Sequence, residues 1–130
     1  MNADNALTEK VLGAVFEVAN TLGAGLLEKV YERALLKELT LRGIRAESQP
    51  SLSVHYKGER IGDYYADLLV EGFLVVELKR AGRLTNEHLA QCIHYLRASN
   101  LALCLLINFQ RPTVEWRRVA NKFLPAGAPS

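Results

Sequence analysis

Several features that would narrow the class of this protein are scarce in its sequence. Its 130 residues include two cysteines, too few for the disulfide framework of a small secreted domain. The formal net charge is only +2, which excludes a strongly basic coat and leaves any contact with a polyanion to a local patch. The longest apolar run falls well short of the ~20 residues of a membrane span, and no signal peptide is evident at the N-terminus. We therefore expect a cytoplasmic protein with no membrane segment and with both thiols reduced.

The composition that remains is that of an ordinary globular protein. Hydrophobic residues make up 49% and charged residues 23% of the chain, and its length suits one domain with a sizeable core. We expect that domain to span residues 1–124. The last residues, 125–130, have the composition of a flexible tail.

The spacing of apolar residues predicts the order of helices and strands. Apolar residues recur every three or four positions over residues 7–22 and 26–42, which predicts two helices ended by Gly23 and Gly43. The period then changes to two, and strands are expected over 51–56, 60–69 and 73–80. A third helix capped by Thr85 or Asn86 follows, then strands near 101–109 and 113–117. The order αα-βββ-α-ββ predicts an α/β (α+β) fold in which helices flank a mixed central sheet.

One predicted strand carries charges where apolar residues are expected. In the stretch VVELKRAG, Glu77 and Lys79 fall on the same side of the strand, and burying an unpaired charge costs several kcal/mol. Asp67 precedes them on the neighbouring strand. A three-residue loop, residues 70–72, with Gly72 in the left-handed conformation would pair Asp67 with Val75. Asp67 and Glu77 would then be diagonal neighbours, roughly 7–8 Å apart, and a single divalent cation could bridge them.

A simpler explanation of these charges stays open at this point. Glu77 and Lys79 fit equally well on a solvated strand face, since an acid ten positions upstream of such a pair is weak evidence. Arg80, next to Lys79, adds to a small basic group that would attract phosphate. A second basic group near residues 111–118 is most simply read as solvated charge.

These residues, taken with others, resemble a known superfamily. Asp67 and the run Glu77-Leu78-Lys79 resemble the motif of the PD-(D/E)xK phosphodiesterase superfamily, with alanine in place of the proline. Gln91 and Tyr95 match the Q-x-x-x-Y motif of its RecB-like branch.

A third motif lies upstream, in the second predicted helix. Gly25, Glu28 and Tyr31 match G-x-x-E-x-x-Y, so the chain resembles the small GxxExxY family from about residue 7 to residue 124. Glu28 also falls near the apolar arc of its helix, where a carboxylate needs a partner, although an arginine could supply it. Tyr31 is equally explained as a core aromatic.

The resemblance implies a restriction-endonuclease-like core and a metal-dependent nuclease acting on DNA or RNA with Mg²⁺ or Mn²⁺. The oxygen donors favour these ions over zinc. The implied site consists of metal ligands Asp67, Glu77, the Leu78 carbonyl and Glu28, the catalytic residues Lys79 and Gln91, and the substrate-positioning residues Tyr95, Tyr31 and Arg80. The alternative is a catalytically silent subunit of the same fold that binds nucleic acid or protein. Because the chain is small, a homodimer or a partner protein is also considered.

Overall fold

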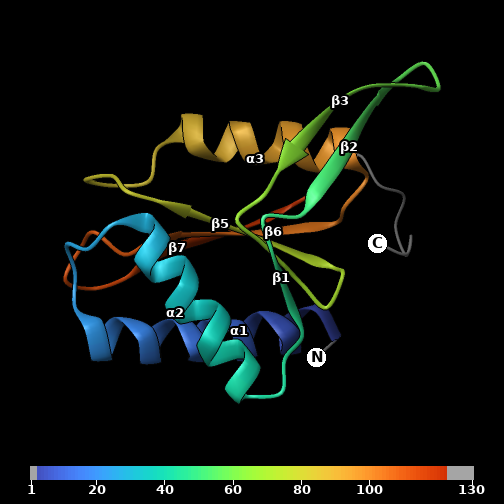
Figure 1. Cartoon of the computed structure of the whole chain (residues 1–130). Coiled ribbons are helices and arrows are strands. Elements are labelled where there is room, and N and C mark those ends of the chain that lie inside the picture. Colours follow the sequence, from blue (N-terminus) through green and yellow to red (C-terminus); the bar gives the residue numbers. More distant parts are fainter. Residues whose placement is uncertain (1–2, 123–130) are drawn as a thin grey trace.

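The computed structural model describes residues 3–122 of the chain, and Figure 1 shows their arrangement. The predicted tail, residues 125–130, lies outside the described residues. No helix within the described part is long and apolar enough to cross a membrane. The elements are α1 (Ala3–Leu22), α2 (Glu28–Leu41), β1 (Ala46–Ser48), β2 (Ser51–Tyr56), β3 (Glu59–Tyr65), β4 (Leu68–Val70), β5 (Leu74–Lys79), α3 (Asn86–Ser99), β6 (Leu103–Asn108) and β7 (Glu115–Ala120).

The molecule has three layers built around a mixed sheet. Five strands form this sheet in the order β1-β4-β5-β6-β7, and β5 and β6 are its parallel pair. Helices α1 and α2 cover one face, whereas α3 and the two-stranded β2-β3 hairpin cover the other (Figure 1). The predicted mixed sheet flanked by helices is therefore confirmed.

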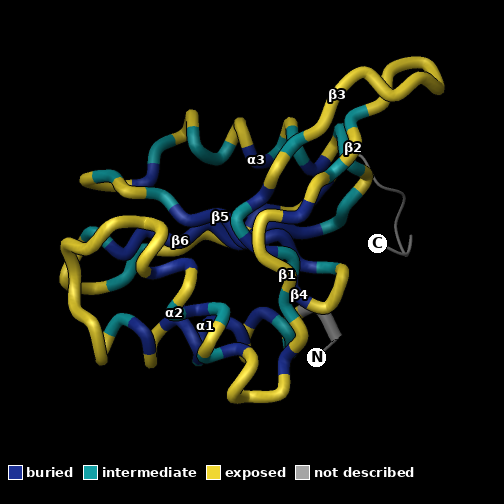
Figure 2. The backbone as a smooth tube through the Cα atoms, in the orientation of Figure 1, coloured by how far each residue is buried: buried dark blue, intermediate teal, exposed yellow. Residues whose placement is uncertain are grey.

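Both faces of the central strands are buried, which explains their nearly continuous apolar sequence. Along β5, Leu74, Val76 and Leu78 pack in the core beneath α1 and α2, and Val75 packs in the core beneath α3. The sheet is the darkest, most buried part of Figure 2, and the hairpin tip is exposed. Because side chains alternate along a strand, Glu77 is on the same side of β5 as Val75, facing α3. Its carboxylate therefore lies in the protein interior and not in solvent.

The helix ends follow the predicted signals. Gly23 and Gly43, which follow α1 and α2, have φ of 74° and 73°, a conformation that glycine adopts at little cost. At the start of α3, Thr85 Oγ1 accepts a hydrogen bond from the backbone N–H of His88 at 3.3 Å. Of the two predicted caps, Thr85 and Asn86, Thr85 is confirmed.

The predicted single strand over residues 60–69 is wrong. The chain leaves the hairpin after β3 and enters the central sheet at β4, with Ala66 and Asp67 at the crossing. The Ala66 N–H donates to the Pro50 carbonyl at 3.3 Å, and the Gln49 N–H donates to the Asp67 carbonyl at 2.9 Å. These bonds to the segment before β2 turn the chain from one sheet to the other. The short β1 strand was also not predicted, so five strands precede α3 in place of three.

The predicted pairing of Asp67 with Val75 is wrong by two residues. Strands β4 and β5 pair Leu69 with Val75 and Val70 with Leu74. The loop is therefore residues 71–73, and Val70 stays in the strand because its side chain is fully buried in the core. Gly72 has the predicted left-handed conformation, with φ of 64°. Extended by one residue, this register sets Asp67 opposite Glu77, closer than the predicted diagonal.

Candidate active site

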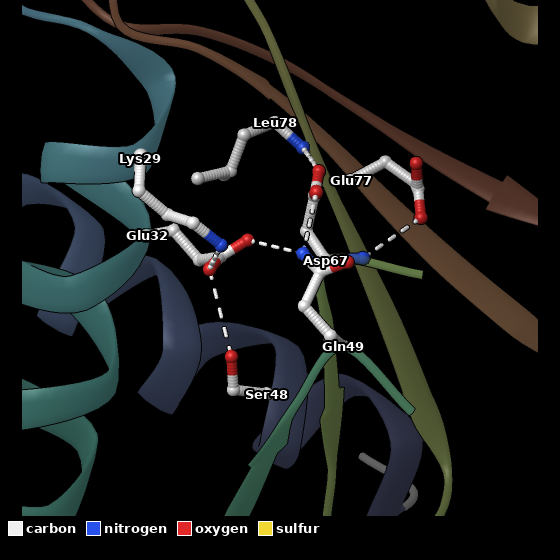
Figure 3. Close-up of polar contacts among 7 residues, drawn as sticks. All are labelled: Lys29, Glu32, Ser48, Gln49, Asp67, Glu77 and Leu78. Carbon is white, nitrogen blue, oxygen red and sulfur yellow. Dashed lines mark hydrogen bonds and ion pairs between the residues drawn. The ribbon is translucent and has the colours of Figure 1, made fainter. Parts of the chain in front are cut away.

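Two carboxylates meet where β4 begins and β5 approaches its end. Asp67 Oδ2 accepts a hydrogen bond from the Leu78 backbone N–H at 2.7 Å, and Glu77 Oε1 accepts one from the Asp67 backbone N–H at 3.3 Å. Figure 3 shows these reciprocal contacts between the two strands. The carboxylate of each acid thus accepts a hydrogen bond from the backbone of the strand that carries the other acid. The pair is held by these backbone groups rather than by a cationic side chain.

Burial makes this pair electrostatically unfavourable. Glu77 is only 7% exposed, and burial is the main cause that raises its pKa from 4.5 to about 7, with the Asp67 charge adding to the rise. The pKa of Asp67 is also raised, again mainly by burial, although the Leu78 N–H opposes the shift. Tyr64 and Lys79 lower the pKa of Glu77, but they do not cancel the effect of burial. A cation bound between the carboxylates would offset the electrostatic cost of burying these charges.

A chain of polar side chains links the end of β5 to α3. Lys79 Nζ donates to Gln91 Oε1 at 3.2 Å, and Gln91 Nε2 donates to Tyr95 Oη at 3.3 Å. The ring of Tyr95 stacks on Tyr64 of β3, with centroids 3.6 Å apart and planes 7° from parallel. The structure therefore brings the predicted lysine, glutamine and tyrosine together beside Glu77.

Glu28 reaches the same end of β5 from the other side of the sheet. It is the first residue of α2, and it lines a small pocket together with Lys79 and Arg80. Its pKa is raised by partial burial and then by the charge of Asp67, while Lys79 lowers it. Glu28 and the Lys79–Arg80 pair thus lie within electrostatic reach of Asp67. The Arg80 side chain is exposed.

Tyr31 occupies the core instead of the open side of the site. It is 2% exposed, and its ring stacks on Phe109 with centroids 4.4 Å apart. Its hydroxyl donates to the Gly23 carbonyl at 2.5 Å and accepts from the Leu26 N–H at 3.1 Å. Tyr31 therefore ties down the loop that leads to Glu28, and the structure does not bring it to the surface of the site.

Three residues of the site were missed from the sequence: Tyr64, which lies beside Glu77, and the linked pair Glu32 and Gln49. Glu32 is 5% exposed, and Gln49 Nε2 donates to its Oε1 at 2.6 Å and to Asp67 Oδ1 at 3.4 Å (Figure 3). Gln49 has φ of 51°, a left-handed conformation that costs a non-glycine residue energy. Lys29 Nζ, 2.8 Å from Glu32 Oε2, neutralises part of the buried charge. Gln49 thus sets the orientation of Asp67 from a position that no motif marks.

The donors at this site suit a hard cation that completes its shell with water. Within residues 3–122, no three histidine, cysteine or acidic side chains converge to enclose a metal ion. Mg²⁺ does not need such a cage, because it is usually held by one or two carboxylates together with water and substrate phosphates. The carboxylates of buried Glu77 and half-buried Asp67 supply that set.

Comparisons with known proteins bear on the family and the fold of the chain. The family model of the PD-(D/E)XK nuclease superfamily matches residues 5–119. None of the curated proteins matches the sequence significantly. Among solved structures, the crystal structure of SSO0001 is similar, with a TM-score of 0.56 at 16% identity. The match covers 71% of this chain and 48% of that one, so this chain spans about half the length of that protein. The mixed α+β architecture is consistent with the predicted restriction-endonuclease-like fold.

Proposed function

The chain belongs to the PD-(D/E)XK nuclease superfamily, and we propose that it hydrolyses phosphodiester bonds of DNA or RNA at the carboxyl end of β5. The observation that carries the proposal is the pair of acids joined through the two strands, buried Glu77 and half-buried Asp67, with Lys79 one strand step beyond. An ordinary solvated strand face would leave these acids exposed. Here folding buries Glu77 and half-buries Asp67 beside it, and a binding site for a cation explains why this cost is tolerated.

Nucleases of this superfamily generally use divalent metal ions. We propose that Asp67 and Glu77 ligate Mg²⁺ or Mn²⁺, with help from the Leu78 carbonyl and with Glu28 acting through water. When bound, such a cation polarises a phosphate oxygen and lowers the pKa of a water ligand. The reciprocal hydrogen bonds between the two strands support the assignment, because they hold the carboxylates in place before a cation arrives.

The side chains around the carboxylates have distinct proposed roles. The ammonium of Lys79 orients the attacking water or offsets negative charge that develops on the phosphate. Gln91 holds Lys79 through its amide oxygen, and Tyr95 holds Gln91 in turn. Arg80, exposed next to Lys79, binds the neighbouring phosphate of the substrate. Tyr31 acts indirectly, through the loop before Glu28.

The finer family assignment is also a proposal. The G-x-x-E-x-x-Y residues support membership of the GxxExxY family, because Tyr31 holds the loop that presents Glu28 to the site. The Q-x-x-x-Y residues support the RecB-like branch, because Gln91 and Tyr95 form one hydrogen-bonded chain with Lys79.

One observation favours the alternative of a catalytically silent nuclease-fold subunit. No third acidic side chain among the described residues completes a cage around the pair, so the affinity for a cation depends on two carboxylates and on substrate. A silent subunit would bind nucleic acid without cutting it, and this outcome is separable by experiment.

The test is a cleavage assay on labelled single-stranded and duplex DNA and RNA, with Mn²⁺, Mg²⁺ or EDTA. We expect metal-dependent cleavage that falls about 100-fold or more in Glu77→Gln and in Lys79→Ala. The matched controls are Glu9→Gln and Lys10→Ala, which remove the same charges from exposed positions on α1. Cleavage that persists in EDTA, or that survives both site substitutions, would remove the mechanism. Binding without cleavage by the wild type would favour the silent subunit.

A further inference from the structure

A row of arginines extends from the proposed active site toward the edge of the sheet. Two shallow depressions lie there, with volumes of about 460 and 680 Å³, and Arg111 lines both. Arg80 lines the smaller one, and Arg117 and Arg118 of β7 line the larger one beside Trp116. These four arginines and Trp116 are called the arginine face below. All of them are exposed.

Buried hydrogen bonds hold the loops that carry this face. Asn108 is fully buried at the end of β6, and its Nδ2 donates to the Ala81 carbonyl at 2.8 Å and to Glu115 Oε1 at 3.3 Å. The same Glu115 oxygen accepts from the Leu84 backbone N–H at 2.8 Å. The loop after β5 and the loop after β6 are thus joined through Asn108 and Glu115. A pre-organised loop loses little entropy when its side chains bind a ligand.

The arginine face is predominantly positive, although the whole chain carries a formal net charge of only +2. Glu115 is the one acidic residue lining either depression within the described residues, against four arginines. Its carboxylate is engaged with the Leu84 N–H and Asn108 and forms an ion pair with Arg117 at 4.0 Å, and nearby Arg111 and Arg117 help to lower its pKa. The Arg111 guanidinium donates a hydrogen bond to the Gly82 carbonyl at 3.1 Å. Most of the positive charge therefore stays available to an anionic ligand.

The face is continuous with the catalytic residues. Arg80 follows Lys79 directly, and both line a small pocket with Glu28. At the far end, Trp116 is 37% exposed on the edge strand β7, where by alternation it shares one side with Arg118 while Arg117 takes the other. Arginines bind phosphates through paired N–H groups, and exposed aromatic rings stack on unpaired bases. Several arginines spread over two adjoining depressions, with one exposed aromatic ring among them, suit a strand of nucleic acid and not a compact anion.

We infer that the arginine face binds a single-stranded segment of nucleic acid that leads into the active site. Its arginines contact successive phosphates without reading sequence, and Trp116 stacks on a base. The inference rests on the proposed function for the direction of the strand, but binding itself is measurable without catalysis. Because the depressions are shallow and Trp116 needs an unpaired base, a single strand fits better than a duplex.

The test measures binding of a fluorescein-labelled oligo(dT) of about twelve nucleotides by anisotropy, in EDTA and at several salt concentrations. A matching poly(dA)·oligo(dT) duplex serves as the second probe. The variant Arg111→Gln/Arg117→Gln/Arg118→Gln removes three contacts and should lower the slope of log K against log[salt] by about 2. The substitution Trp116→Ala should weaken binding of the single strand about fivefold or more. The same variant should bind the duplex with nearly the affinity of the wild type.

The control is Lys37→Gln/Arg45→Gln, which removes two exposed charges from α2 and the loop that follows it. We expect its affinity and salt slope to match the wild type, and circular dichroism should show every variant folded. A triple arginine variant that binds like the control would overturn the inference, as would a wild type that does not bind oligo(dT). Equal loss of single-strand and duplex binding in Trp116→Ala would overturn the stacking role.

Failure of this inference and failure of the proposed function give different results. If the wild type cleaves with Mn²⁺ but the arginine substitutions leave binding unchanged, the nuclease stands and the arginine face is wrong. If the substitutions weaken binding as expected but no cleavage occurs, the arginine face stands and the catalytic proposal is wrong.

Discussion

Replacing Glu77 with glutamine should stabilise the metal-free protein at alkaline pH while weakening its response to divalent cations. Glu77 is 7% exposed and shares its site with Asp67, and burial with this neighbour raises its pKa from 4.5 to about 7. Glutamine has nearly the same shape and keeps an oxygen for the Asp67 N–H, but it carries no charge to desolvate. The charge that is proposed to bind a cation should therefore lower the stability of the metal-free protein.

The sign of the pH dependence follows from the direction of the shift. Because the pKa of Glu77 is higher in the folded state, the unfolded state loses its proton first as the pH rises. The stability that this group contributes is present below its ordinary pKa of 4.5 and is lost as the pH rises through about 7. At about 1.4 kcal/mol per pKa unit, the loss between about pH 5 and about pH 8 is roughly 2–3 kcal/mol.

The assay is urea denaturation of the wild type, Glu77→Gln and the control Glu9→Gln, at both pH values in EDTA. The wild type and the control should lose stability between about pH 5 and about pH 8, and Glu77→Gln should lose roughly 2 kcal/mol less. Added Mn²⁺ should then stabilise the wild type at about pH 8 more than it stabilises Glu77→Gln. An identical pH dependence in wild type and Glu77→Gln, or equal stabilisation by Mn²⁺, would refute the reasoning.

Three further substitutions test other parts of the structure. Gln49→Ala removes the amide between Glu32 and Asp67, so Mn²⁺ affinity measured by calorimetry should fall about 10- to 100-fold; unchanged affinity would contradict the orienting role. Leu105→Ala empties a fully buried position of β6 and should lower the free energy of unfolding by about 2–5 kcal/mol in urea; a loss under about 1 kcal/mol would argue against tight packing there. Thr85→Ala removes the cap of α3 and should cost about 0.5–2 kcal/mol, whereas Thr85→Ser should cost less; equal losses in the two variants would argue against the cap.

Elements set by local interactions were predictable from the sequence. The helices α1 and α2 follow the apolar period, and the Thr85 cap marks α3 because its partner N–H lies only three residues away. Strand β6 was predicted because both its faces are buried, which leaves a continuous apolar run.

Elements set by distant contacts were not predictable in the same way. Strands β1 and β4 have three residues each, too few to show a period. The crossing at Asp67 is fixed by the N–H of Gln49, a contact across 18 residues. The register of β4 on β5 depended on whether Val70 belonged to the strand or to the loop. Because Val70 is fully buried, it stays in the strand and pairs with Leu74, so the predicted loop is wrong.

The residues of the candidate site also divide into those that were predictable from the sequence and those that were not. The period of two put Glu77 and Lys79 on one side of β5, and the resemblance supplied Glu28, Gln91 and their partners. Glu32 carried a usable signal, since it lies three and seven residues before Leu35 and Leu39 on the buried stripe of α2. Gln49 carried none, because its left-handed backbone and its bridge to Asp67 depend on the finished fold.

The most direct test of the central claim is the anomalous diffraction signal of Mn²⁺ in crystals of the wild-type protein. The account predicts a peak between Asp67 and Glu77, with a carboxylate oxygen of each about 2.0–2.6 Å away. A well-ordered site with no peak there at saturating Mn²⁺, or a peak bound only by residues elsewhere, would contradict it.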